Sequence, residues 1–269
     1  MKFRFHKYQG TGNDFIMIDD RETSFPQDDI AFIAHCCDRR FGIGADGLIL
    51  IQNHPTADFK MVYYNADGRE STLCGNGARC TVAFAASLGM IDQQTTFMAI
   101  DGLHMATIEK DQTVSLRMHD VSDFRCEKDH TFLDTGSPHH VAMVTDLPQF
   151  EVVEKGRAIR QGAPYFDAGT NVNFVEKINE NTFAIRTYER GVEDETLSCG
   201  TGATAVALAM HKTGVTTAQS INIMVEGGQL TVSFKAGDSA YTHIDLQGPA
   251  TFVFEGEIAW APLEYIYAP

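Results

Sequence analysis

Two cysteines occupy the same place in a short motif that the chain contains twice. Cys74 begins the segment Cys-Gly-Asn-Gly-Ala, and Cys199 begins Cys-Gly-Thr-Gly-Ala 125 residues later. We expect each motif to open a helix, and a helix N-terminus carries unpaired backbone N–H groups and about half a positive charge. That environment lowers the pKa of a thiol, so that thiolate forms at neutral pH. The motif therefore predicts two reactive sulfurs.

The backbone N–H groups beside these cysteines are predicted to bind a carboxylate. They belong to Gly75 and Asn76 in the first motif and to Gly200 and Thr201 in the second, and glycine permits a close approach of the backbone to an anion. If the two motifs face one cleft, the sulfurs flank one carbon from opposite sides. Stereoinversion at carbon needs a base on one face and an acid on the other. The pattern favours an enzyme that moves the proton of an α-carbon.

The cysteine motif is one anchor of a repeat that runs through the chain, and a duplicated fold places a shared site between its copies. We expect one domain over residues 1–120, to which residues 250–269 return as an added strand, and a second over residues 121–249. The active site is expected in the cleft between them. The other anchors keep an offset of 124 or 125: Gly12-Asn13 with Gly136-Ser137, Tyr64-Asn65 with Tyr188-Glu189, and Asp101-Gly102 with Glu226-Gly227.

The hydrophobic patterns along the chain predict an α+β fold of two pseudo-symmetric domains, each a barrel-like mixed sheet around a central helix. An apolar run follows each cysteine and stops at Gly89 or Gly214, which is typical of a helix enclosed by its own domain. A helix over Pro26–Phe41, ended by Gly42, is expected only in the first half. Strands are predicted at Phe15–Ile18, Leu48–Ile51, Asn222–Val225 and Leu230–Phe234.

Composition and charge exclude several classes of partner. The net charge is −15 and no basic run occurs, which argues against nucleic acid and against anionic membrane surfaces. No apolar stretch reaches the length of a signal peptide or of a membrane-spanning helix. We therefore expect a cytoplasmic protein with 43% hydrophobic residues packed into globular domains.

The chain has six cysteines, and in a cytosolic protein they are expected to be free thiols. Cys36, Cys37, Cys80 and Cys126 have no cysteine at the matching position of the other half. We interpret these four as structural, because a buried inert thiol is the usual role of cysteine.

Zinc is the main chemical alternative for Cys74, Cys80 and the histidines. Five residues separate the two cysteines, and His139 directly precedes His140. Neither spacing matches the pairs that hold zinc. We expect no metal and no cofactor.

The full set of motifs resembles the diaminopimelate epimerase family along essentially the whole chain. That resemblance implies interconversion of LL- and meso-diaminopimelate without pyridoxal phosphate or metal, on the route to lysine and peptidoglycan. It also implies two similar domains that close over the substrate, and a homodimer. The motifs are Gly12-Asn13-Asp14-Phe15, Gly42-Ile43-Gly44-Ala45-Asp46-Gly47, Tyr64-Asn65-Ala66-Asp67-Gly68, Cys74-Gly75-Asn76-Gly77-Ala78-Arg79-Cys80, Pro138-His139, Thr170-Asn171-Val172, Tyr188-Glu189-Arg190-Gly191 and Cys199-Gly200-Thr201-Gly202.

By matching position, the resemblance gives Cys74 and Cys199 the acid and base roles and gives the two helix starts the α-carboxylate. The distal end of the substrate falls to asparagines and an arginine, whose amides and planar guanidinium suit ammonium and carboxylate groups. Two further residues near the thiols are expected to hold the substrate amino group or to tune a thiol; read alone, they are a surface carboxylate and a core imidazole. The distal residues are Asn13, Asn65, Asn171 and Arg190, and the two near the thiols are Glu189 and His139.

Three departures from the family pattern concern recognition of the distal end. Ser137 stands where many members have asparagine, Gly47 stands where some have glutamine, and the segment Val192–Ser198 is one residue longer. None of the three touches the pair of thiols.

Two other functions are compatible with the pattern. Proline racemases and hydroxyproline epimerases share the two-cysteine logic, but Asn76 and Glu189-Arg190 favour diaminopimelate. A binding protein that has kept the fold without catalysis would have no need of both thiols. Turnover of each substrate and α-proton exchange in deuterated water distinguish these possibilities.

Overall fold

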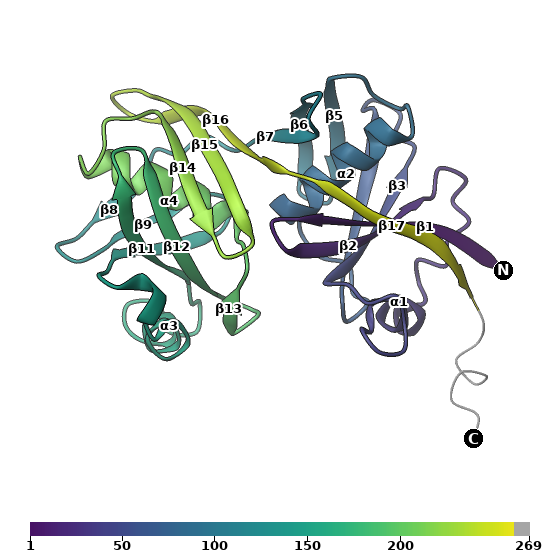
Figure 1. The fold of residues 1–269 in the computed structure, drawn as a ribbon, viewed down its shortest axis with the longest axis horizontal. Coiled ribbons are helices and arrows are strands. Elements are labelled where there is room, and N and C mark those ends of the chain that lie inside the picture. The colour runs from purple at the N-terminus through teal and green to yellow at the C-terminus, as the bar shows by residue number, and fades with distance from the viewer. Residues whose placement is uncertain (261–269) are drawn as a thin grey trace. The chain divides into compact units, whose positions relative to one another are not determined.

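The computed structural model describes residues 1–260, which divide into two compact units (Figure 1). The first unit comprises Met1–Leu116 and the segment that begins at Pro249. The second unit is the continuous stretch Arg117–Gly248. The chain therefore leaves the first unit once and returns to it after the second is complete.

The first unit is a mixed sheet whose last strand comes from the end of the described chain. Going across the sheet, the neighbouring pairs are antiparallel, antiparallel, parallel, antiparallel, parallel, antiparallel and antiparallel. In that order the strands are β17 (Thr251–Ala259), β1 (Lys2–Gly10), β2 (Asn13–Asp19), β3 (Gly47–Gln52), β4 (Phe59–Asn65), β5 (Gln94–Ala99), β6 (Gly102–Ile108) and β7 (Thr113–Arg117).

The second unit repeats the same succession of parallel and antiparallel pairs. A short additional strand, β13 (Asp194–Thr196), pairs with the end of its central strand β12. This correspondence shows the internal duplication in the backbone itself. In order the strands are β8 (Phe124–Cys126), β9 (Thr131–Asp134), β10 (Pro138–Met143), β11 (Asn171–Asn179), β12 (Thr182–Glu189), β14 (Ser220–Val225), β15 (Gly228–Ala236) and β16 (Tyr241–Pro249).

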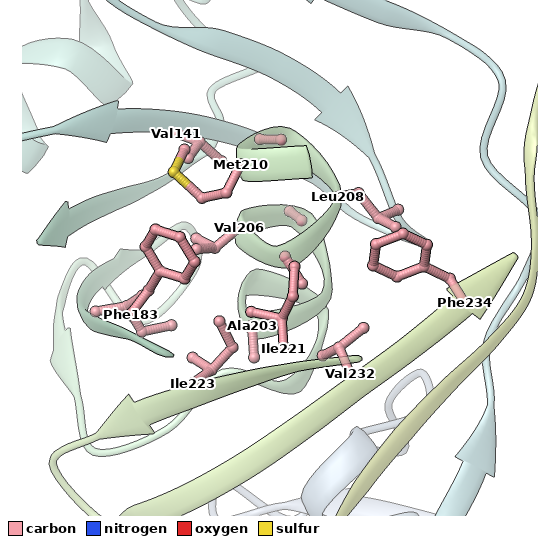
Figure 2. Packing of buried hydrophobic residues seen from close by; sticks show 14 of the residues in the cluster. Val141, Phe183, Ala203, Val206, Leu208, Met210, Ile221, Ile223, Val232 and Phe234 are labelled. Carbon is pink, nitrogen blue, oxygen red and sulfur yellow. The ribbon is translucent and has the colours of Figure 1, made fainter. Parts of the chain in front are cut away.

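Each unit encloses one apolar helix, which confirms the predicted α+β fold with central helices. The helix α2 (Gly75–Ser87) lies among the strands of the first unit and α4 (Gly200–Lys212) among those of the second (Figure 1). Figure 2 shows side chains of α4 packed against residues from several strands of its own unit. Burial of each large apolar side chain contributes about 1.5–3 kcal/mol, so the helix is held by its contacts all round. The labelled residues include Val206, Leu208, Met210, Phe183, Ile221, Ile223 and Phe234.

The helix predicted over Pro26–Phe41 is shorter than expected. It spans Ile30–Cys37 as α1, because the side chain of Asp29 caps its start by accepting a hydrogen bond from the backbone N–H of Phe32 at 3.0 Å. The helix ends at Asp38, whose backbone is extended, and not at Gly42. The carboxylate of Asp38 accepts the following backbone N–H groups and holds them in a turn. Local side-chain caps therefore override the composition that suggested a longer helix.

The prediction that this helix belongs only to the first half is wrong. The second unit has α3 (Val152–Gln161), which follows the short 3₁₀ helix η1 (Leu147–Gln149) and lies between β10 and β11 in the chain, as α1 lies between β2 and β3. It packs outside the sheet with Val172, Phe174 and Tyr188. The two helices differ in composition, because α1 is almost wholly apolar whereas α3 mixes apolar residues with charged ones. That difference hid the repeat in the sequence.

Three of the four cysteines interpreted as structural are buried, and one is not. Burial raises the pKa of Cys36, Cys37 and Cys80 to about 12, so these thiols remain protonated. Cys126 is exposed on β8, so a packing role does not apply to it. Within residues 1–260 no helix is long and apolar enough to cross a membrane.

Candidate active site

Each of the two motif cysteines is the residue directly before a buried helix. The backbone of Cys74 is extended, with φ −99° and ψ 121°, and its carbonyl accepts the first helical hydrogen bond from Ala78 at 2.8 Å. Cys199 has φ −122° and ψ 111°, and its carbonyl accepts from Ala203 at 2.9 Å. The N–H groups before Ala78 and Ala203 therefore precede the first intrahelical bond, as in any helix N-terminus. The predicted helix starts are confirmed.

In the first unit, the sulfur of Cys74 faces a hydrogen-bond acceptor. The Oδ1 atom of Asn13 lies 3.5 Å from Cys74 Sγ and 3.3 Å from Asn76 Nδ2. The other end of the Asn13 amide donates to the carboxylate of Asp46. Because a carboxylate only accepts, this bond fixes the amide with its oxygen towards the thiol. Asn13 therefore faces Cys74 as an acceptor, and the sulfur is the donor in this contact.

Asp46, which holds the Asn13 amide, belongs to a cluster of charged groups. The guanidinium of Arg39 bridges Asp14 and Asp46 at 2.7 Å each, and Lys7 pairs with Asp14 at 2.8 Å. Burial alone would raise the pKa of Asp14, but the hydrogen bonds and charges of Arg39 and Lys7 lower it to about 2. The carboxyl group of Asp14 is therefore ionised at neutral pH.

The buried guanidinium of Arg79 orients the second asparagine near Cys74. Arg79 is fully buried and donates to Asn76 Oδ1 at 2.9 Å and to Thr11 Oγ1 at 3.3 Å. Burial lowers the pKa of Arg79. Since arginine only donates, Asn76 accepts through its oxygen and its amide nitrogen points at Asn13. The sequence motif contains Arg79, but nothing in the sequence indicated this orienting role.

In the second unit, Cys199 lies between a hydroxyl and a carboxylate. Thr201 Oγ1 is 3.5 Å from Cys199 Sγ, and the side chain of Glu189 hydrogen-bonds with the same thiol. Glu189 also accepts a hydrogen bond from Thr196. Burial raises the pKa of Glu189, and the bonds from Thr196 and Cys199 oppose that rise. A carboxylate with a raised pKa beside a thiol can exchange a proton with it.

His139 has a fully buried imidazole ring that contacts Thr201, the residue whose hydroxyl faces the Cys199 thiol. Its Nε2 atom lies 2.9 Å from Thr201 Oγ1, and its Nδ1 atom lies 3.1 Å from Asn173 Nδ2. Burial, aided by the charge of Arg190, lowers the pKa of His139 to about 3. His139 is therefore neutral at physiological pH and acts through its hydrogen bonds.

The residues expected at the distal end of the substrate differ in how they are engaged. Asn171 is buried, donates to Ser137 Oγ at 3.0 Å and accepts the backbone N–H of Arg190 at 2.9 Å. Its amide therefore holds the neighbouring loop, and Ser137 completes that contact. The side chain of Arg190 is exposed and donates to a backbone carbonyl, and Asn65 is exposed at the end of β4.

Gly47 leaves no room for a glutamine side chain without rearrangement. A Cβ atom built on Gly47 would lie 2.5 Å from the backbone oxygen of Tyr64 and 2.5 Å from the ring of Tyr63. The tyrosine ring occupies the space that a side chain here would need. Among residues 1–260, no group of three His, Cys, Asp or Glu side chains is arranged to hold a metal ion.

Besides the role of Arg79, sequence reasoning missed two residues that hold the site together. Asp46 was part of a quoted motif without a role, and Asn173 was not singled out. A signal for Asn173 existed, because residues two apart on a strand share a face and Asn171 and Asn173 both lie on β11. Asp46 lies 33 residues from Asn13 in the chain, so only the folded sheet brings the pair together.

Comparison with known proteins gives a consistent match over the whole chain. The family model described as diaminopimelate epimerase matches residues 5–122 and 131–253. A diaminopimelate epimerase from Flavobacterium psychrophilum is 56% identical over 255 residues, covering 95% of this chain and 100% of the relative. A protein of the same name from Chlorobaculum tepidum is 43% identical and covers 93% of this chain and 98% of the relative.

Solved structures match at much lower identity. A phenazine biosynthesis protein of the PhzF family from Bacillus anthracis superposes with a TM-score of 0.77 at 14% identity, covering 97% of this chain and 100% of that chain. A hydroxyproline epimerase from Agrobacterium vitis gives a TM-score of 0.68 at 14% identity, covering 96% and 92%. At such identities the likeness concerns the fold alone.

Proposed function

Because the chain belongs to the diaminopimelate epimerase family, we propose that it interconverts LL-2,6-diaminopimelate and meso-diaminopimelate in lysine and peptidoglycan precursor synthesis. The observation that supports this most directly is the repeated placement of a cysteine before a buried helix. Cys74 and Cys199 occupy equivalent positions in two copies of one fold. A duplicated scaffold needs no thiol at both positions for packing, whereas inversion at carbon needs two proton carriers.

We call the residues around Cys74 and those around Cys199 the two half-sites. In the proposed mechanism they close around one α-carbon of the substrate. The thiolate of one cysteine removes the α-proton and becomes a thiol, and the electron pair of the broken C–H bond is delocalised into the α-carboxylate. The thiol of the other cysteine then donates its proton to the opposite face and becomes a thiolate. One proton is lost and one gained, so only the configuration changes. The reverse reaction exchanges the two roles.

The helix starts stabilise the charge that develops during this reaction. The α-carboxylate lies at the N–H groups of Gly75 and Asn76 in one unit and of Gly200 and Thr201 in the other. Those dipoles are fixed before the reaction and favour negative charge. Deprotonation adds charge to the carboxylate, so preorganised donors act most strongly in the transition state. This accounts for catalysis by the protein's own groups, without pyridoxal phosphate or a metal.

Glu189 and His139 support the chemistry at Cys199. Glu189 hydrogen-bonds with the thiol and has a raised pKa, so it is suited to exchange a proton with Cys199 or to hold the substrate ammonium group. His139 hydrogen-bonds with the hydroxyl of Thr201, which contacts Cys199, so His139 orients that hydroxyl and does not itself titrate near neutral pH.

Arg190 and Asn65 are the distal-end residues with exposed side chains, and we propose that they bind the second amino-acid group of diaminopimelate. Asn171 contributes indirectly, because its amide positions the backbone of Arg190. Asn13 contributes to the pocket beside Cys74, where its oxygen faces the thiol.

We propose a homodimer in the cytoplasm. Strand β17 exposes Phe252, Val253 and Phe254, whose exposed fractions are 48%, 50% and 45%, and a cluster of exposed apolar residues favours a protein interface. Val253→Glu places a charge on this surface and should convert dimer to monomer in sedimentation equilibrium. A reducing compartment suits an enzyme that works with two free thiols.

The proposed activity is tested by incubation with LL-diaminopimelate in deuterium oxide without added cofactor. We expect meso-diaminopimelate that carries deuterium at the inverted α-carbon. L-Proline and hydroxyproline serve as matched substrates and should remain unchanged. Inversion of proline with no action on diaminopimelate would reject the assignment in favour of a racemase of the related group. Absence of deuterium from every substrate would indicate a binding protein.

A further inference from the structure

The side chain of Asn173 is fully buried and has a fixed orientation. Its Nδ2 atom lies 3.1 Å from the backbone oxygen of His140, and its Oδ1 atom accepts the hydroxyl of Thr187 at 3.0 Å. A carbonyl oxygen cannot donate, so the Asn173 atom that faces it must be the nitrogen. The orientation of the amide is therefore set by the backbone of β10.

That orientation determines which nitrogen of His139 carries the proton. The Nδ2 atom of Asn173 also lies 3.1 Å from His139 Nδ1, and an amide nitrogen only donates. Nδ1 must therefore be the unprotonated nitrogen of the ring. Because burial keeps the imidazole neutral, its single proton is on Nε2.

The proton on Nε2 in turn determines how Thr201 meets Cys199. His139 Nε2 donates to Thr201 Oγ1 at 2.9 Å, so the hydroxyl hydrogen of Thr201 is available for the sulfur at 3.5 Å. In the other tautomer Nε2 would accept that hydrogen, and the hydroxyl would present only lone pairs to the sulfur. Hydrogen bonds donated to a thiolate stabilise it.

We propose that Asn173 is a positioning residue that holds His139 in its Nε2–H tautomer and thereby directs the Thr201 hydroxyl to donate to the Cys199 thiolate. This inference rests on the acid and base role given to Cys199 in the proposed function. It assigns Asn173 no contact with substrate. Asn173 acts through two intermediate side chains, of which only the last touches the sulfur.

The start of α4 is shaped to accept this arrangement. A Cβ atom built on Gly202 would lie 2.5 Å from Asn173 Oδ1, so only glycine permits the amide to approach the helix this closely. The other ionisable groups around Cys199 are Glu189, which hydrogen-bonds with the thiol, and Arg190, whose charge acts on His139. Because Glu189 hydrogen-bonds with the thiol, its protonation state also affects how readily the thiolate forms.

The first test is the tautomer of His139 in the unmodified enzyme. Nitrogen-15 NMR of the histidine rings distinguishes a protonated from an unprotonated ring nitrogen, and His139→Asn identifies the signals by removing them. We expect Nδ1 unprotonated and Nε2 protonated at pH 8. A proton on Nδ1 would overturn the proposal.

The second test follows the thiol by carbon-13 NMR of cysteine labelled at Cβ, with the Cys199 signal identified by Cys199→Ser. Asn173→Asp has the same shape but can only accept, so it should move the proton to Nδ1 and raise the apparent pKa of Cys199 by about one unit. Asn179→Asp is the matched control at the opposite, exposed end of β11, where the side-chain oxygen already accepts, and it should change neither signal nor turnover.

Thr201→Val tests the last step without touching Asn173. It removes the hydroxyl at nearly constant volume and should raise the pKa of Cys199 by the same amount, while Thr201→Ser should retain the original value. The double variant should show no further rise; additive shifts would mean that Asn173 acts by another route and would reject the proposal. If Asn173→Asp does not fold, the wild-type tautomer and the Thr201 variants still decide. None of these signals needs substrate, so they stand or fall independently of diaminopimelate turnover.

Discussion

Cys74 and Cys199 precede equivalent helices, yet the side chains that contact their sulfurs differ. Cys74 faces the oxygen of Asn13, which is held in place by the charged cluster of Asp46 and Arg39. Cys199 faces the hydroxyl of Thr201, which is held through neutral side chains, with the carboxyl group of Glu189 alongside. An acceptor favours the thiol form and a donor favours the thiolate form. Duplication has preserved the backbone of the site while its hydrogen-bonding character has diverged.

The largest expected effect is the loss of either sulfur. Cys74→Ala and Cys199→Ala each remove one proton carrier and little core volume, so epimerisation should fall by at least about 10²–10⁴-fold with the fold intact. Turnover of both epimers and circular dichroism measure this. The matched control is Cys126→Ala, which removes an exposed thiol from β8 and should retain full activity. Near-normal turnover by either active-site variant would break the comparison, because only one thiol would then be needed.

The next effect isolates the charged support of the first half-site. Asp46→Asn removes a charge-assisted hydrogen bond to Asn13, which is worth about 1.5–3 kcal/mol, and allows the amide to turn its nitrogen towards Cys74. We expect kcat to fall roughly tenfold, since RT gives a factor of ten per about 1.4 kcal/mol. Asp92→Asn, an exposed change of the same kind in the same unit, should have no effect on steady-state kinetics. Unchanged kinetics in Asp46→Asn would show that the cluster only stabilises the fold.

Lowering the pH should distinguish the neutral network around His139 from the charged cluster that contains Asp14. The pKa of His139 is about 3 in the folded protein against an ordinary value of 6.5, so the unfolded chain binds a proton first as the pH falls. Stability is therefore lost from about pH 6.5 downwards, by up to about 1.4 kcal/mol per pH unit. Asp14 has a pKa of about 2 against 3.8, so its stabilisation is lost only as the pH falls from about 3.8 to 2.

Hydrogen exchange followed by mass spectrometry measures this difference. Protection of α4 should decline between pH 6.5 and 4, and His139→Gln should remove part of that decline. His140 has a pKa of about 4 and contributes in the same direction, and burial also lowers the pKa of His6 in the first unit. Protection of α2 that declines earlier than that of α4 would contradict the assignment of the neutral network to the second unit.

The smallest effect compares two equivalent glycines. A Cβ atom on Gly202 would meet Asn173 Oδ1 at 2.5 Å, whereas one on Gly77 would meet the end of the flexible Ile49 side chain at 3.0 Å. Alanine gains about 1 kcal/mol of helix propensity at either position, so Gly77→Ala should be nearly neutral. Gly202→Ala should lower the free energy of unfolding by about 1 kcal/mol and reduce turnover severalfold. Equal effects in denaturant titrations would show that the two helix starts are packed alike.

The repeat and the helix starts could be predicted from the sequence because they depend on local residue types. Cys-Gly-x-Gly-Ala opens a helix in both copies, and the apolar runs identify the enclosed segments. The equivalence of α1 and α3 could not be predicted, since α1 is almost wholly apolar and α3 is amphipathic, while both cover the outer face of a sheet. Amphipathic contacts with the sheet determine that position, and these appear only once the strands are paired.

The supporting residues of the site illustrate the same limit. Asn13 was identified from its motif, but the direction of its amide depends on Asp46, which reaches it from the neighbouring strand's start. His139 was identified as a residue near a thiol, but its neutral state depends on burial and its tautomer on Asn173. Sequence patterns predict which residue types lie at the helix starts. The direction of the hydrogen bond between His139 and Asn173 follows only from the register of β10 with β11.

The pairing of β17 with β1 has a consequence for how the chain is made. Residues 117–248 are synthesised as a continuous stretch that contains every strand of the second unit. One edge of β1, in contrast, stays unpaired until β17, residues 251–259, has been synthesised. The second unit can therefore complete its sheet without β17, whereas the first unit cannot. During translation the nascent first unit presents an unpaired strand edge, of the kind that recruits chaperones or other chains.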